Sequence, residues 1–146
     1  MRRASMKDRK VMWAALGVVG AIVVVAVALF FFSWGSGSVN VSVDGEGLNV
    51  DAPLVNENIS YNDIVSIETR EGMDFGNRTN GFGGSKVLSG KFNNSEFGSY
   101  TLACYKNVKK YIVIELTAGE MLVLNQDSIE ETLLLYDELF EKWDNI

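Results

Sequence analysis

The chain has 146 residues, with 13 Lys and Arg residues against 19 Asp and Glu residues, and a formal net charge of −6. It contains no histidine and one cysteine, Cys104. Without histidine, the chain lacks the commonest general base and metal ligand of proteins. A single cysteine excludes a disulfide within the chain. The length is enough for one small domain beside any membrane segment.

An uninterrupted apolar segment occupies residues 11–34 and contains no charged side chain. About 20 apolar residues are enough to span a bilayer, so we predict a transmembrane helix over 11–34, with Trp13 and Trp34 near its interfaces. Residues 1–10 are basic, whereas residues 35–146 carry 8 basic and 18 acidic side chains, hence −10. Basic flanks stay in the cytoplasm, which predicts a cytoplasmic N-terminus and an extracytoplasmic C-terminal part. An outside domain without a disulfide fits a prokaryotic surface.

Two further interpretations of this segment stay open. The basic start and the triplet Ala26-Val27-Ala28 also suit a cleaved signal peptide, although the apolar run continues through Phe32. Gly17 and Ala21 have the spacing that lets two membrane helices approach closely, which would allow a homodimer. Ordinary membrane-helix composition explains the same two residues.

A Gly/Ser linker follows at residues 35–38, and residues 39–146 form the predicted soluble domain. Alternating or continuous apolar runs bounded by turn residues predict about seven short antiparallel strands. These runs lie at residues 39–43, 48–50, 59–61, 64–69, 87–92, 98–105, 111–117 and 121–124. The Gly- and Asn-rich stretch from Glu71 to Ser85 is predicted to be a loop.

The apolar period then changes to that of an α-helix. One stripe has spacings of 4, 3, 4 and 3 residues: Ile129, Leu133, Tyr136, Phe140 and Trp143. Asp127 or Ser128 is the expected N-cap, and Glu138 with Lys142 forms a favourable i,i+4 pair. An amphipathic C-terminal helix that closes an antiparallel sandwich or barrel makes the fold class α+β.

Strands closed by one C-terminal helix resemble the pleckstrin-homology (PH) superfold. The residues that carry a closer resemblance, to a bacterial and archaeal PH-like family, are Arg78-Thr-Asn-Gly-Phe-Gly83, Gly90-Lys-Phe92, Gly98, Tyr105, Ile112-Val-Ile114 and Gly119. The resemblance covers about residues 59–143 and implies a PH-like domain attached to a membrane helix. It implies no catalytic residues.

The best candidate for a partner-binding surface is the glycine-rich stretch that contains Arg78, Asn80, Gly81, Phe82 and Gly83. Arginine and aromatic side chains commonly anchor interfaces, and glycines let a partner approach the backbone. The structural alternative is that Phe82 turns into the core and Arg78 pairs with Asp74 or Glu71. We expect a protein or peptide partner.

No catalytic residue, metal ligand or cofactor is predicted. The acidic turn around Asp44 lacks the spacing of a calcium loop, and three lysines (Lys106, Lys109 and Lys110) are too few to indicate nucleic-acid binding or specific recognition of anionic lipids. Three alternatives remain: an accessory domain of an envelope enzyme or transporter, a hydrolase with paired buried carboxylates, and a site for a small apolar ligand or lipid between sheet and helix.

Overall fold

The computed structural model describes residues 6–146, apart from the side chains of residues 32–34. Residues 1–5 of the predicted basic segment and the indole of Trp34 therefore lie outside the described part. The chain forms two compact units, one that ends at Gly35 and one from Ser36 to Ile146. Each unit is described by itself.

The first unit is helix α1, Met6–Trp34, which begins earlier than the predicted residue 11. Its candidate membrane span is Met6–Phe31, with a mean hydropathy of 2.8. Apolar side chains such as Leu16, Ile22 and Phe31 are all exposed in the described chain. A helix that is apolar on every side requires an apolar environment, and a bilayer supplies one. A signal sequence shares these features.

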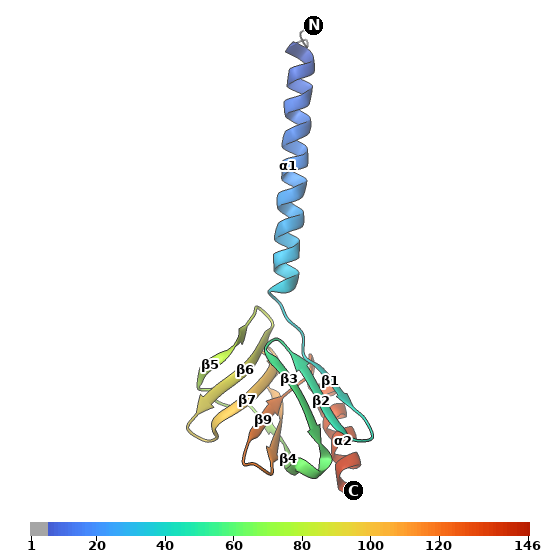
Figure 1. Ribbon diagram of the computed structural model, residues 1–146, viewed down its shortest axis with the longest axis vertical. Coiled ribbons are helices and arrows are strands. Elements are labelled where there is room, and N and C mark those ends of the chain that lie inside the picture. The colour runs from blue at the N-terminus through green and yellow to red at the C-terminus, as the bar shows by residue number, and fades with distance from the viewer. Residues whose placement is uncertain (1–5) are drawn as a thin grey trace. The chain divides into compact units, whose positions relative to one another are not determined.

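The second unit contains nine strands in two sheets and a C-terminal helix, α2, which confirms the predicted fold class (Figure 1). A three-stranded sheet has the order β1-β2-β3, and a six-stranded sheet has the order β4-β8-β9-β7-β6-β5. The strands are β1 (Asn40–Val43), β2 (Gly47–Ala52), β3 (Val55–Ser60), β4 (Ile64–Glu71), β5 (Asn77–Gly83), β6 (Val87–Asn94), β7 (Gly98–Tyr105), β8 (Lys110–Leu116) and β9 (Met121–Leu124).

Two features of the sheets differ from the prediction. Residues 77–83, expected to lie in a loop, form strand β5 and pair with β6. This strand lies at the edge of the sheet and is exposed along most of its length, so its residues need not alternate between apolar and polar. For this reason the sequence did not predict a strand here. The pair β7·β9 is parallel, whereas every other pair is antiparallel. This arises because β9 enters the sheet between β8 and β7.

The first apolar core lies between the two sheets and α2 (Ile129–Asp144). Leu48, Ile112, Leu124 and Leu139 are completely buried there. Ser128 caps α2 by accepting the N–H of Glu131 at 3.1 Å, as expected. Lys142 and Glu138 form the predicted ion pair at 3.0 Å.

A second apolar core covers the other face of the six-stranded sheet. Leu102, Tyr111 and Val123 are at most 1% exposed on this face. The connection from β4 to β5, residues 72–76, supplies the side chains of Met73 and Phe75 that pack on this cluster. We call this connection the strap. If only one face of this sheet were covered, the apolar side chains on the other face of β7, β8 and β9 would be exposed to water. Each Å² of exposed apolar surface would cost roughly 25 cal/mol of folding free energy.

The face of α2 that packs on the core differs from the predicted apolar stripe by a rotation about the helix axis. Thr132 and Leu139 are completely buried, whereas Ile129 is 53% exposed and Phe140 is 36% exposed. Tyr136 and Trp143 belong to both faces and are partly buried. Phe140, a member of the predicted stripe, is therefore not fully buried. Leu133, Leu134 and Leu135 are consecutive, so the apolar spacing permits more than one face.

This geometry predicts that Leu139→Ala destabilises the domain far more than Phe140→Ala. The first change opens a cavity in the core and should cost about 2–5 kcal/mol. The second removes a half-exposed ring and should cost about 1 kcal/mol. Urea denaturation of residues 36–146 measures both values. Equal costs, or a larger cost for Phe140→Ala, would contradict this placement of α2.

Candidate functional site

The five predicted site residues lie together on β5, at one edge of the six-stranded sheet. Arg78, Asn80 and Gly83 are exposed, and Gly81 and Phe82 are partly buried. A register shift between Arg78 and Asn80 marks a β-bulge, after which four consecutive residues, Asn80 to Gly83, pair regularly with β6. The candidate site is thus a short, regular strand with one edge open.

The glycines of this region have structural reasons of their own. Gly81 pairs with Gly90 across the two strands, and a Cβ atom at either position would collide with the backbone of the other strand. A Cβ atom at Gly83 would collide with the guanidinium of Arg78. The glycines therefore let β5 and β6 approach each other, and they let the Arg78 side chain lie along the strand.

Phe82 turns inward, which is the structural alternative stated for it above. Its ring packs against the first apolar core. A Cβ atom at Gly37 would lie 2.9 Å from Phe82 Cε1, so the ring also covers the start of the domain. Phe82 is therefore a partly buried side chain that packs on the core, and it does not project as an anchor.

Arg78 does not form either of the ion pairs considered above in the described part of the chain. Glu71 instead pairs with Lys110 at 3.5 Å, and the carboxylate of Asp74 accepts the N–H of Gly76 at 2.9 Å. The Arg78 side chain is exposed. It remains available to an acidic or carbonyl group of a partner.

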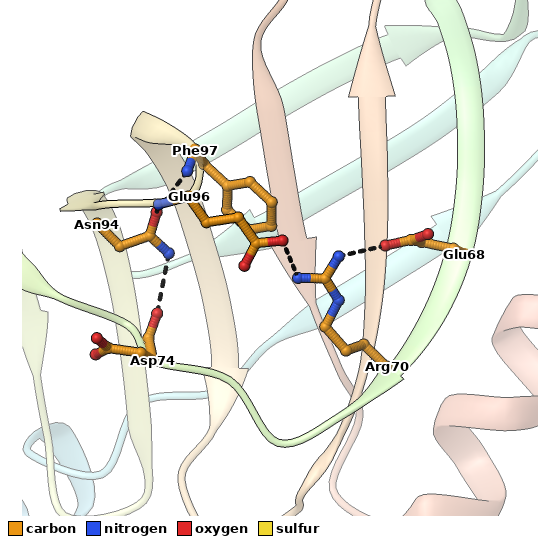
Figure 2. A network of polar contacts seen from close by, with 6 residues as sticks. All are labelled: Glu68, Arg70, Asp74, Asn94, Glu96 and Phe97. Carbon is orange, nitrogen blue, oxygen red and sulfur yellow. Dashed lines mark hydrogen bonds and ion pairs between the residues drawn. The ribbon is translucent and has the colours of Figure 1, made fainter.

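The strap fixes where β5 begins. Asn94 on β6 is 8% exposed, and its amide donates to the Asp74 carbonyl at 2.9 Å. Its Oδ1 accepts the N–H groups of Glu96 and Phe97, as Figure 2 shows. The Tyr100 hydroxyl donates to the Phe75 carbonyl at 2.8 Å. Burial raises the pKa of Tyr100, so this hydroxyl stays protonated and keeps donating.

An arginine secures the other end of the strap. The Arg70 guanidinium donates to Glu96 and to Glu68, both at 2.6 Å, and lies over the Phe97 ring (Figure 2). These hydrogen bonds, the one to Glu96 above all, raise the pKa of Arg70. The side chain is part-exposed, so each pair contributes modestly to stability, at most about 1 kcal/mol. Their main effect is to hold the end of β4 against the β6–β7 hairpin.

The acidic turn around Asp44 serves the fold. The Asp44 carboxylate accepts the N–H groups of Glu46 and Gly47 at 2.8 and 2.9 Å, and both hydrogen bonds lower its pKa. An open cavity of about 410 Å³ lies beside it, lined also by Tyr61, Glu138 and Lys142. The amine of Lys142 already donates to Glu138 and to the Val43 carbonyl there. Nothing in the sequence pattern indicated this cavity.

The buried polar side chains of the described residues are all uncharged: Ser89, Asn94, Thr101, Asn125 and Thr132. The criterion set above for a carboxylate-based enzyme, two buried acidic groups that face each other, is therefore not met among the described residues. Burial raises the pKa of the Cys104 thiol to about 12, which leaves it unreactive near neutral pH. That the protein is not an enzyme stays a prediction.

Comparison with known proteins identifies the domain. The family model described as "Bacterial PH domain" matches residues 39–131, which include both sheets and the first residues of α2. The chain belongs to this family. No curated protein and no solved structure matches the chain. The PH domain is therefore shown, whereas the comparisons give no information about a binding partner.

Single substitutions on β5 of the PH domain should separate its structural from its exposed side chains. Phe82→Ala removes a ring that packs on the core and should cost roughly 2 kcal/mol. Arg78→Ala changes an exposed side chain and should change stability by no more than about 0.5 kcal/mol. Thermal unfolding of residues 36–146 gives both values. If Arg78→Ala were the more destabilising change, our description of β5 would be wrong.

Proposed function

We propose that the protein is a single-pass membrane protein whose PH domain binds an extended peptide segment of a protein partner. The partner segment would add a strand to the open edge of β5. In this mode, backbone hydrogen bonds supply affinity, and side-chain contacts on alternate residues supply specificity. The open edge of β5 is the single observation that carries the proposal.

The domain has other sheet edges, but side chains from elsewhere in the domain reach them. Lys142 donates to the Val43 carbonyl at the end of β1, and the Trp143 indole donates to the Ile64 carbonyl at the start of β4. At β3 the contact is with a side chain and not with the backbone: Lys91 lies 3.9 Å from the carboxylate of Glu57. No side-chain hydrogen bond reaches the backbone of β5 within the described part of the chain. Natural proteins usually protect such edges, so an open one favours a binding role.

The composition of β5 suits a transient partner. It carries one charged side chain, Arg78, and no proline. Proline and inward-pointing charges are among the features that block strand addition, and the one such feature of β5, its bulge, precedes the regular stretch that begins at Asn80. Arg78 would offer a bidentate donor to an acidic group that flanks the added strand. The regular stretch from Asn80 to Gly83 would accommodate about four partner residues.

The membrane setting supports a partner at the cell surface. Helix α1 is long and apolar enough to span a bilayer. The basic residues that precede it favour a cytoplasmic N-terminus, which would place the PH domain outside the cytoplasm. The partner could then be another membrane subunit, as in an envelope enzyme or transporter complex. Pairing of two copies through Gly17 and Ala21 would also be compatible with this arrangement. By contrast, an apolar ligand between sheet and helix would have to displace the completely buried Leu139.

A cysteine-directed photocrosslinker on intact cells tests the proposal. Asn80→Cys places the reagent on β5, and Asn62→Cys places it on an equally polar, exposed residue of the short 3₁₀ turn η1, Tyr61–Asp63. Cys104 is completely buried and should not react. With a membrane-impermeant reagent we expect both variants to be labelled, and a protein adduct from position 80 alone.

A synthetic peptide of the crosslinked segment should then bind the domain. Methylation of alternate backbone nitrogens should weaken that binding at least about tenfold, because each lost hydrogen bond costs on the order of 1 kcal/mol. Labelling that requires cell lysis would overturn the orientation. Equal adducts from positions 62 and 80, or unchanged binding of the methylated peptide, would overturn the β5 site.

A further inference from the structure

The predicted Gly/Ser linker, residues 35–38, is shorter in the structure, because Gly37 already packs against the PH domain. Pro53 Cγ, Phe82 Cε1 and Val87 Cβ surround Gly37, and a Cβ atom there would lie 3.1, 2.9 and 3.4 Å from them. Val39 is 3% exposed, and its N–H donates to the Tyr105 hydroxyl at 3.2 Å. The folded domain therefore begins by Gly37, and only residues 35 and 36 separate this position from the end of α1.

This attachment limits how far the domain can lie from a bilayer. Helix α1 ends at Trp34, and three residues further on the chain is already packed at Gly37. A fully extended chain of three residues spans at most about 10 Å. If α1 is the membrane anchor proposed above, the part of the domain around Gly37 must stay within about that distance of the membrane surface.

The hairpin that joins β2 to β3 lies at this end of the domain and carries an unusual residue. Its two-residue turn is Pro53-Leu54, and Pro53 packs beside Gly37. Leu54 has φ +60° and is 72% exposed. That backbone conformation is usually taken by glycine or asparagine, and a leucine there is strained. An exposed leucine in a strained turn breaks a local rule, and such departures concentrate at functional positions.

Three lysines gather at the same end. The Lys106 N–H donates to the Lys86 carbonyl at 2.8 Å, and the Lys109 amine donates to the Lys106 carbonyl at 3.4 Å. Asn125, which is completely buried, holds this turn by bonding Tyr105 and Val108. Figure 1 shows the β2–β3 and β5–β6 hairpin turns at the end of the domain that the linker enters.

We infer that this end of the PH domain rests on the bilayer, with Leu54 inserted at the level of the lipid headgroups and Lys86, Lys106 and Lys109 above the phosphates. The inference rests on the proposed membrane anchoring. One leucine and three lysines are too few to bring a free domain to a membrane. A tether of about three residues makes the encounter intramolecular, so weak contacts are sufficient. The contact would fix the orientation of β5 with respect to the membrane.

A polarity-sensitive fluorophore on the full-length protein in lipid vesicles tests the inference. The fluorophore nitrobenzoxadiazole is attached to Leu54→Cys, and to Ile146→Cys as the matched control, since both residues are 72% exposed. Cys104 is completely buried and stays unlabelled. The vesicles contain phosphatidylcholine and phosphatidylglycerol, with an acyl-chain spin label as quencher in both leaflets.

At position 54 we expect blue-shifted emission and a roughly twofold loss of intensity with the quencher, because an interfacial side chain lies about 5–10 Å into the bilayer boundary. At position 146 neither change is expected. Flotation of the vesicles at high salt reports the anchoring separately. If the protein floats with the vesicles but the probe at position 54 is not quenched, the membrane contact of this end is wrong and the anchoring still holds. Loss of flotation would overturn the anchoring and the inference together.

Discussion

Burial of both faces of the six-stranded sheet is the constraint on which the rest of the PH domain depends. Its central strands carry completely buried side chains on each face, such as Ile112 toward α2 and Val123 toward the strap. The three-stranded sheet and α2 cover one face, and a strap of five residues covers the other. So short a strap must be held tightly. Asn94 and Tyr100 bond to its backbone, and Arg70 ties the end of β4, where the strap begins, to Glu96.

The position of the strap decides where β5 can lie. Gly76 ends the strap with φ +69°, and a Cβ atom there would collide with the backbone of Asn93. The chain therefore enters β5 directly beside β6, and the pairing of Gly81 with Gly90 keeps the two strands close. Two glycines and a bulge make β5 a poor core strand, and its outer edge stays open. The fold itself thus generates the surface that we propose for partner binding.

Sequence patterns correctly predicted the strands and the helix whose apolar residues recur with a regular period. They did not predict features that depend on contacts between distant parts of the chain. The alternation at residues 39–43, the apolar run at 111–117 and the Ser128 cap were all found correctly. Strand β5 was missed because an exposed edge carries no apolar period. The helix face was misjudged because Leu135 and Leu139 compete with Leu133 and Phe140 for the core, and spacing alone does not rank them. The five residues of the predicted site do lie together on β5, although glycine packing, rather than partner approach, explains Gly81.

Amide hydrogen exchange, resolved by residue in the intact protein, tests most directly whether β5 is a strand paired on one side. In residues 80–83, which follow the bulge, we predict that protected and unprotected amides alternate. Amides bonded to β6 should exchange at least about 100-fold more slowly than in an unstructured peptide, and amides on the open edge should exchange quickly. All amides of β7, β8 and β9 should be protected. Uniformly fast exchange from Glu71 to Ser85 would mean that the segment is a loop. Uniform protection would mean that the edge is already covered.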